Sequence, residues 1–387
     1  MNTILRNIKG DKVIWVVVIL LSIFSILAVY SSTGTLAYKY KSGNTEYYVF
    51  KHLVILALGF ILMYLTHLIK YTYFSRIFQI ALYVAFPLLI LTLLIGLNLN
   101  EAKRVLPLPF NLTFQTSDLA KLTLIMVIAR ALTKKDIDLN VFKNAVRYLF
   151  LPTILICGLI LPSNFSTAAL LFSICIILMF IGRVKLKYIG YFIAMMIFAL
   201  FLLFLVNKAF PGAVPRAQTW ENRMKSFFQK DNKDDDNVYQ VEQSKIAIAS
   251  GGLFGKMPGN STQRNFLPHP YSDFIFAIII EEYGLVGGTF VVLLYLILFF
   301  RIVKIVTKVP RNFGALIAFG VGFSLVFQAL INMMVAVNLL PVTGQPLPLV
   351  SMGGTSIWFT SIAIGIILSV SKEIDNKTIN EEEFATA

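Results

Sequence analysis

The stretch DFIFAIIIEEYGLVGGTFVVLLYLILFF (273–300) is almost entirely apolar. About 20 apolar residues allow an α-helix to cross the hydrocarbon core of a bilayer, so the stretch predicts a membrane-spanning helix. Three carboxylates break the pattern: Asp273 stands at its start, and Glu281 and Glu282 lie within it. An ionisable side chain inside a span costs about 2.5–3.5 kcal/mol on insertion scales, which makes all three candidates for a functional role.

The composition of the whole chain points to the same class. Of 387 residues, 57% are hydrophobic and 14% are charged, whereas soluble proteins average about 45–50% apolar and about 25% charged residues. We therefore expect an all-α polytopic membrane protein that forms one integral-membrane domain over residues 1–387. Ten apolar segments are candidate spans: 13–30, 49–68, 77–97, 113–132, 147–162, 165–182, 187–206, 273–300, 313–339 and 354–370. A count of nine or eleven stays open, because the runs near 150–165 are short. Pro162-Ser163-Asn164 predicts a tight turn between the fifth and sixth segments, with Asn164 or Ser166 as the cap of the next helix.

Lysine and arginine are distributed unequally between the short loops on the two sides. One side collects Arg6, Lys9, Lys12, Lys70, Arg76, Lys134, Lys135, Lys143, Arg147, Arg183, Lys185, Lys187, Arg301, Lys304, Lys308 and Arg311. The other side holds only Lys39, Lys41, Lys51, Lys103 and Arg104. Because cytoplasmic loops are enriched in these residues, both termini are predicted to be cytoplasmic. The asymmetry accounts for much of the net charge of +14, so nucleic acid is not an expected partner.

This orientation places the long loop 207–272, between the seventh and eighth helices, on the extracytoplasmic side. Trp220, Met224, Phe227 and Phe228 recur in it at helical spacing, which predicts a short amphipathic helix on the bilayer surface. The charged run KDNKDDDN (230–237) predicts a solvated, flexible segment. The residues that follow begin with a possible helix and end in a stretch rich in Gly, Asn, Ser and Thr, whose backbone N–H groups can face an anion.

Polar residues in or beside the spans predict a chamber that opens outward. They are Gln115, Ser117, Asp118 and Lys121 at the fourth span, Glu281 and Glu282 in the eighth, and Gln328 and Asn332 in the ninth. Asp118 and Lys121 are three residues apart and can pair on one helix face, with a purely structural pair as the alternative. The two glutamates point about 100° apart on a helix, so both cannot face one partner, and one of them is expected to be structural. Gly284 and its neighbouring glycines predict close helix packing.

Four stretches together resemble the SEDS family, the polytopic proteins of bacterial shape, elongation, division and sporulation. They are FQTSDLAKL (114–122), PSNFSTA (162–168), the segment from YQVEQSKIAIASGG to IIIEEYGLVGG (239–288), and NLLPVTGQPLPLVSMGGTS (338–356). The resemblance covers essentially the whole chain and implies ten helices with a large extracytoplasmic loop before the eighth. Asn164 replaces an Asp of the family pattern, which argues against a catalytic role at that position.

The resemblance implies a peptidoglycan glycosyltransferase that polymerises lipid II together with a class B penicillin-binding protein. The family's catalytic Asp corresponds to Asp273. Joining a sugar hydroxyl to an anomeric carbon with inversion needs one carboxylate as general base near the attacking hydroxyl. It also needs positive or N–H-rich groups at the leaving pyrophosphate. The candidate substrate-binding residues are Arg104, Gln115, Ser117, Asp118, Lys121, Lys256, Gln263 and Arg264.

Structural or chamber-shaping roles are expected for Glu281, Glu282, Gln328 and Asn332. The glutamates lie about 12–14 Å deeper than Asp273, too far to share its proton, and a basic partner such as Lys121 is expected for them. No cofactor is required by these residues. A divalent cation, Mg²⁺ or Mn²⁺, stays open as a participant, and Asp118 or Glu282 could help to hold one.

Other functions compete with the polymerase. A lipid II transporter would use the same intramembrane charges, but inverted repeats with paired broken helices are typical of transporters, and no convincing internal repeat is visible. A third hypothesis is that the protein is a scaffold that only organises a penicillin-binding protein. The ending PVTGQPLPLVSMGGTSIWFTSIAIGIILSVS (341–371) is more similar to the division branch of the family than to the elongation branch. We therefore expect a protein of the bacterial cytoplasmic membrane that works at the division septum with other divisome proteins.

Overall fold

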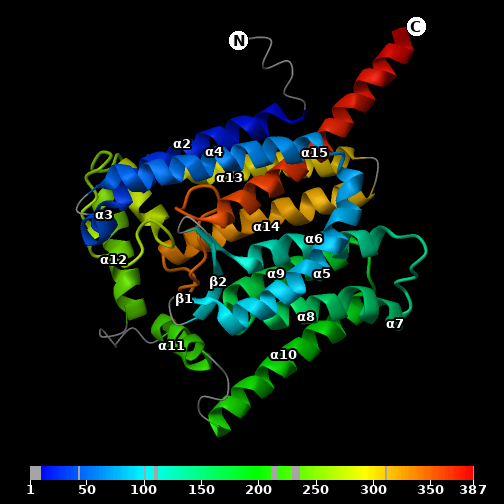
Figure 1. Ribbon diagram of the computed structural model, residues 1–387, viewed down its shortest axis with the longest axis horizontal. Coiled ribbons are helices and arrows are strands. Elements are labelled where there is room, and N and C mark those ends of the chain that lie inside the picture. Colours follow the sequence, from blue (N-terminus) through cyan, green and yellow to red (C-terminus); the bar gives the residue numbers. More distant parts are fainter. Residues whose placement is uncertain are drawn as a thin grey trace. The chain divides into compact units, whose positions relative to one another are not determined.

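The computed structural model describes residues 10–41, 44–99, 102–108, 112–210, 216–228, 236–309 and 312–386. Residues 230–235 of the predicted flexible run lie outside this description. Helices make up nearly all of the regular structure (Figure 1). The chain forms two compact units, which are described separately. The first comprises Met1–Ile69, Arg223–Lys308 and Leu325–Ala387, and the second comprises Lys70–Asn222 and Val309–Ser324.

The first unit is a helical bundle. Its elements are α2 (Lys12–Ser32), α3 (Gly34–Lys41), α4 (Thr45–Leu68), α12 (Asp236–Gly251), the short 3₁₀ helix η3 (Gln263–Asn265), α13 (Ile275–Lys308), the second half of α14 (Asn312–Ala336) and α15 (Thr355–Thr386). Polar caps decide where two of the spans begin. The Asp11 carboxylate accepts from the N–H groups of Val13 and Ile14, and the Asn44 side chain accepts from the Tyr47 N–H. Such caps satisfy N–H groups that have no partner within the helix.

Helices α2 and α13 pack against each other along their length in opposite directions. At one end, Arg301 of α13 binds the Asp11 carboxylate, with Nη2 and Oδ2 separated by 2.7 Å. At the other end, the Ser31 hydroxyl of α2 donates to the Glu282 carboxylate of α13. The Phe24 ring packs between these ends against aromatic rings of α13. The two polar contacts therefore fix the register of the helix pair.

The second unit combines helices with a small sheet. Its elements are α5 (Tyr71–Ile95), β1 (Leu97–Leu99), β2 (Ala102–Leu108), β3 (Leu112–Phe114), α6 (Thr116–Thr133), α7 (Phe142–Ala145), the π-helical turn η2 (Val146–Phe150), α8 (Leu151–Ile160), α9 (Phe165–Ile181), α10 (Leu186–Ala209) and the first half of α14. The strands form an antiparallel sheet in the order β1-β2-β3, with Leu97 opposite Val105 and Leu106 opposite Phe114.

This sheet corrects the predicted boundaries of two spans. The third predicted span reaches residue 97 and the fourth begins at 113, whereas α5 ends at Ile95 and α6 begins at Thr116. The connecting residues pair with one another as strands. Strand pairing supplies partners for backbone N–H and C=O groups close to the membrane, where water is scarce. Periodicity alone does not show this, because the apolar residues of the strands extend the apolar runs of the neighbouring helices.

The ten predicted spans all coincide with helices. Eight helices in the described part of the chain are long and apolar enough to cross a membrane, and the fifth predicted span is the continuous helix Phe142–Ile160 formed by α7, η2 and α8. Helix α9 is apolar but shorter, and α6 carries Asp118, Lys121 and Arg130. Asn164 caps α9 by accepting from the Thr167 N–H at 3.2 Å, as the tight turn before it predicts. The polytopic all-α membrane fold is therefore confirmed, with the small sheet as an addition.

Two predicted helices of the long loop are also present. Helix α11 (Ala217–Phe228) coincides with the predicted amphipathic segment, and α12 with the possible helix after the charged run. Trp220 is buried and packs against the rings of Phe165 and Phe204. Met224 and Phe228 are exposed. The contact of α11 with the bilayer surface stays a prediction.

Candidate active site

Asp273 stands two residues before the first residue of α13, at the end of the long loop 207–272. Its side chain is partly exposed. The Oδ1 atom accepts the Ser272 hydroxyl at 2.8 Å. Among the residues that the structure describes, no Lys, Arg or His nitrogen lies within 4.0 Å of this carboxylate. Asp273 is therefore an accessible carboxylate whose charge no ion pair neutralises.

The backbone around Asp273 is held much more firmly than its side chain. Three successive carbonyl groups, those of residues 271–273, accept hydrogen bonds from segments that lie far away in the sequence. The donors are the Met352 N–H to Tyr271 at 2.9 Å, the Ser351 hydroxyl to Ser272 at 2.6 Å and the Asn332 side-chain amide to Asp273 at 2.8 Å. These contacts join the third and fourth sequence motifs and fix the position of Asp273.

Gln328 and Asn332 stand one turn apart on α14 and both bind backbone carbonyls. The Gln328 amide donates to the Pro346 carbonyl at 3.0 Å, and the Asn332 amide donates to the Gln345 carbonyl at 2.8 Å. Both side chains therefore bind the backbone of the fourth motif, and Asn332 also holds Asp273. These contacts are structural, and a part in shaping the chamber stays a prediction.

An apolar cluster anchors the residue next to Asp273. Phe274 is 1% exposed and packs with Leu267, Ile278, Val335 and Val342. Burying a Phe side chain stabilises a fold by about 1.5–3 kcal/mol. The buried ring therefore prevents the neighbouring carboxylate from drifting away from the start of α13.

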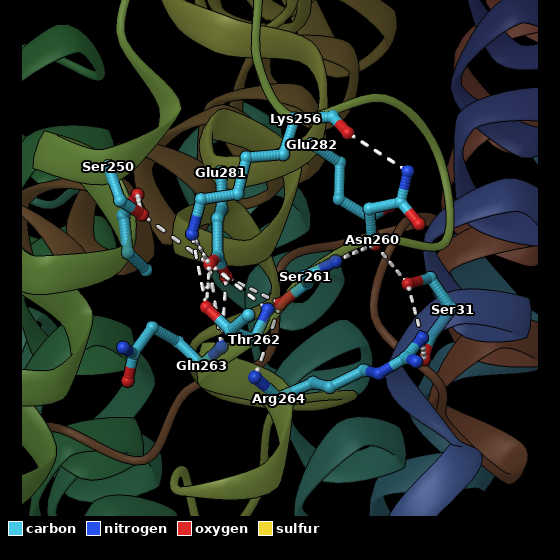
Figure 2. A network of polar contacts seen from close by, with 11 residues as sticks. Ser31, Ser250, Lys256, Asn260, Ser261, Thr262, Gln263, Arg264, Glu281 and Glu282 are labelled. Carbon is cyan, nitrogen blue, oxygen red and sulfur yellow. Dashed lines mark hydrogen bonds and ion pairs between the residues drawn. The ribbon is translucent and has the colours of Figure 1, made fainter.

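The carboxylate of Glu281 is buried, with no exposed side-chain area, and it is surrounded by donors from the loop 256–263 (Figure 2). The donors include the Lys256 ammonium at 2.7 Å, the Ser261 hydroxyl at 2.5 Å, the Thr262 N–H and hydroxyl at 3.1 and 2.9 Å, and the Gln263 N–H at 3.2 Å. The polar loop does face an anion, as its composition predicts. That anion is a carboxylate of the protein itself.

Glu282 belongs to the same network (Figure 2). It accepts the Ser31 hydroxyl and the Ser261 N–H, the latter at 3.2 Å. Arg264 reaches the same place and donates from Nη1 to the Ser31 carbonyl at 3.0 Å. Both glutamates thus contact Ser261, so the expectation that their 100° separation gives them different partners is wrong. One residue can serve both, because its hydroxyl binds Glu281 while its N–H binds Glu282.

The network sits at a break in α13. Gly284 has φ 71° and ψ −173°, a backbone conformation that is open mainly to glycine. Beyond the break, the Leu285 and Val286 N–H groups donate to the carbonyls of Gly252 and Leu253 at 2.9 and 3.2 Å. A Cβ atom on Gly284 would lie 2.1 Å from the Leu253 oxygen. Gly284 therefore allows a loop to join the helix, and the prediction that it serves helix packing is wrong.

The predicted residues of the second unit gather at the start of α6 and at the sheet. Asp118 and Lys121 are both buried and form the predicted ion pair at 3.5 Å. The Gln115 amide donates to the Ser117 hydroxyl at 3.2 Å. On β2, Arg104 donates to the Ser163 carbonyl at 3.1 Å. The Lys121 ammonium was the expected partner for the glutamates of α13, but the basic partner of Glu281 is Lys256.

The donor sets at Asp118 and Glu282 do not fit a divalent cation. Mg²⁺ requires near-octahedral oxygen ligation. The described residues contain no group of three or more His, Cys, Asp or Glu that could hold a metal. Asp118 has an ammonium beside it, and Glu282 is bound by a hydroxyl and an N–H group. No chemical step is therefore assigned to a metal here.

Sequence reasoning missed several residues that build this site. Ser31, Ser261 and Thr262 bind the two glutamates, and Ser351 fixes the backbone beside Asp273. Ser261 lies within the third motif and Ser351 within the fourth, and these positions could have marked both residues as part of the site. Ser31 had no such signal, because a serine at the end of an apolar span is common and its contact with Glu282 joins residues 251 positions apart.

Comparison with known proteins agrees with this geometry. Residues 11–376 match the family model of the cell cycle proteins FtsW, RodA and SpoVE. Stage V sporulation protein E of Bacillus subtilis is 28% identical over 378 residues, which cover 95% of this chain and 98% of that protein. The probable peptidoglycan glycosyltransferase FtsW of Coxiella burnetii is 30% identical over 370 residues, which cover 94% of this chain and 96% of that protein.

A solved structure shows the same fold. It concerns the structural coordination of polymerization and crosslinking by a peptidoglycan synthase complex, and one of its chains matches with a TM-score of 0.70 at 22% identity. The match covers 94% of this chain and 98% of that chain. The family match, the shared fold and the four motifs agree, and the chain therefore belongs to the FtsW, RodA and SpoVE family of cell cycle proteins.

Proposed function

We propose that this protein is a peptidoglycan glycosyltransferase that polymerises lipid II, with Asp273 as its general base. The observation that supports this role most directly is the state of Asp273: a partly exposed carboxylate with no ion-pair partner in the described structure, on a backbone held by three hydrogen bonds. A general base needs an open proton-accepting oxygen and a fixed position. Glu281 and Glu282 lack the open oxygen, because both are buried within a network of donors.

The reaction follows from this assignment. One lipid II molecule supplies the acceptor hydroxyl, and a second supplies the anomeric carbon that carries the undecaprenyl pyrophosphate. Asp273 takes the proton of the acceptor hydroxyl. At the same time, the oxygen of that hydroxyl attacks the anomeric carbon from the face opposite the pyrophosphate. The new glycosidic bond forms, the bond to the pyrophosphate oxygen breaks with its electron pair, and the configuration inverts. Such a base contributes about 10²–10⁴-fold to the rate.

Arg264 is the residue of the first unit that we assign to the leaving pyrophosphate. A guanidinium has five N–H donors, and Arg264 uses Nη1 for the Ser31 carbonyl and hydroxyl. The remaining donors are available for a phosphate, which guanidinium groups bind well. Lys256 suits this role less, because its ammonium binds Glu281 and Thr262. Its role in the fold thus replaces the anion clamp expected from the sequence.

The expected partner is a class B penicillin-binding protein, which would crosslink the strands that this protein makes. The solved synthase complex, which coordinates polymerization with crosslinking, supports such a pairing. We place the protein at the division septum, because its C-terminal motif is most similar to the division branch. Depletion should then give filamentous cells, and round cells would assign it to elongation instead.

Purified protein with its partner, in detergent and with lipid II as the only substrate, tests the function. Wild type should form glycan chains, and Asp273→Asn should lose this activity while keeping its elution profile and melting temperature. Glu46→Gln is the matched control, because Glu46 is an exposed carboxylate in the first turn of α4. Full turnover by Asp273→Asn would reject the base assignment. A wild-type protein that forms no chains would favour a transporter or a scaffold, since detergent offers no second compartment.

A further inference from the structure

The turn between α12 and α13 exposes large apolar side chains. In Gly252–Met257, the exposed fractions are 63% for Leu253, 81% for Phe254 and 68% for Met257. Three such side chains within five residues would be costly in water. The turn belongs to the extracytoplasmic loop, where sequence alone predicts an aqueous setting. The position of the turn along α13 decides whether these side chains face water or the hydrocarbon of the bilayer.

Two polar contacts of the helix pair α2–α13 serve as reference points for depth in the membrane. The two ends of the pair are marked by the Asp11–Arg301 ion pair and by the Ser31–Glu282 hydrogen bond. The ends are separated by 20 residues on α2, an unbroken helix, which at 1.5 Å per residue corresponds to about 30 Å. A bilayer's hydrocarbon core is also about 30 Å thick. The two polar contacts therefore lie at its two edges.

The turn is attached inside this span. Its Gly252 and Leu253 carbonyls bind the N–H groups of Leu285 and Val286. These residues lie three and four positions beyond Glu282 in the direction of Arg301. Counted along the unbroken helix from Arg301, Val286 and Leu285 lie about 22–24 Å away, compared with about 30 Å between the two polar contacts along α2. The turn is therefore attached on the hydrocarbon side of the edge.

Polar backbone groups of the turn have hydrogen-bond partners within the protein, as a position in the hydrocarbon requires. Irregular backbone at membrane depth is tolerated only where its polar groups find partners within the protein. Besides the two carbonyls already named, the Gly255 N–H donates to the Gly251 carbonyl at 2.8 Å and the Lys256 N–H to the Glu281 carbonyl at 2.9 Å. The only charge of the turn, the Lys256 ammonium, binds Glu281 at 2.7 Å. The outward-facing atoms left over are mainly apolar side chains.

The same apolar surface continues on α13. Leu285 is 47% exposed and Val286 is 58% exposed, directly beside the bonded carbonyls of the turn, and Leu293 lies further along the helix with 48% exposed. An exposed apolar face on a spanning helix is in contact with lipid tails. Leu253 and Phe254 extend this face without a polar interruption, so lipid is the occupant that the surface fits.

We propose that Gly252–Met257 is a re-entrant turn that places Leu253 and Phe254 among the acyl chains of one leaflet. Under the predicted orientation this is the outer leaflet. The turn would anchor the segment that leads to Asp273 at the level where a lipid-linked sugar enters. This inference concerns membrane depth, and it holds or fails whatever the chemical role of Asp273.

Site-directed spin labelling of the whole protein in liposomes tests the inference. Cys157 and Cys175 are buried and would first be replaced by alanine. Single labels at Phe254→Cys and Leu253→Cys are then compared with Leu285→Cys, a lipid-facing control, and Glu46→Cys, an exposed control in the first turn of α4. We expect collisions with oxygen to dominate over collisions with a water-soluble nickel complex at 253, 254 and 285, and the reverse at 46.

Two results would overturn the proposal. In the first, labels at 253 and 254 are as accessible to the nickel complex as the label at 46. In the second, they become shielded from it only when the partner protein is added, which would identify the apolar turn as a protein-binding surface. Because both positions are exposed, labelling is expected to leave the fold intact, and an unchanged melting temperature checks this.

Discussion

Asn332 donates its side-chain amide to the carbonyl oxygen of Asp273 at 2.8 Å. The bond joins α14 to Asp273, which lies two residues before the start of α13. It fixes the backbone of Asp273 and leaves the carboxylate oxygens open. Asn332 is 1% exposed. We regard Asn332 as a positioning residue for Asp273.

Replacing Asn332 with alanine should reduce glycan chain formation by about 10–100-fold, since a displacement of about 1 Å can cost about 10²-fold in rate. It should also lower the free energy of unfolding by about 1–3 kcal/mol, because a buried carbonyl loses its donor. Gln328→Ala is the matched control, since Gln328 binds Pro346 and not Asp273. Turnover numbers and melting curves of both variants would measure this. Equal losses of activity in the two variants would contradict a specific role for Asn332.

Gly284→Ala should destabilise the protein strongly. A non-glycine residue at φ 71° is strained by about 1–3 kcal/mol, and the new Cβ would lie 2.1 Å from the Leu253 oxygen. Gly158→Ala in α8 is the control, because its Cβ would meet nothing within 4 Å and alanine favours a helix. We expect a lowered melting temperature for Gly284→Ala alone. Similar melting temperatures in both variants would show that the break in α13 is not needed.

Lys256→Met should leave the Glu281 carboxylate buried without its cation. Removing one partner of a buried ion pair costs about 3–5 kcal/mol, and the cost here should fall near or below the lower end because Lys256 is 30% exposed. Adding Glu281→Gln to Lys256→Met should recover part of the loss. A double-mutant cycle on melting free energies measures this coupling. Additive losses would mean that the hydroxyl and N–H donors alone satisfy Glu281.

The two roles of Asp11 can be separated. Asp11 caps α2 and also binds Arg301 at the opposite edge of the span from Glu282. Asp11→Asn should keep the cap and lose the ion pair, whereas Asp11→Ala should lose both, at an additional cost of about 1 kcal/mol for the cap. Thermal unfolding in detergent compares the two variants. Equal losses in the two variants would contradict a separate capping contribution of residue 11.

Sequence by itself determined the class of fold and most of its helices. Apolar runs of about 20 residues can satisfy their backbone polar groups within a membrane only as helices, so the run length decides the structure locally. The cap at Asn164 was readable for the same reason, because capping acts within four residues. Asp273 was also found from its place in a motif at the start of a span.

Tertiary structure alone decided how the carboxylates are used. Asp118 and Lys121 pair within one helix turn and were therefore predictable, whereas Glu281 depends on Lys256 and Glu282 on Ser31, at sequence separations of 25 and 251 residues. Helical geometry predicted that two adjacent glutamates face different partners. It could not show that a loop wraps around both, because that depends on Gly284 leaving the helical conformation to bond with Leu253. Contacts between distant segments are set by packing and hydrogen bonding in three dimensions, which local sequence patterns do not contain.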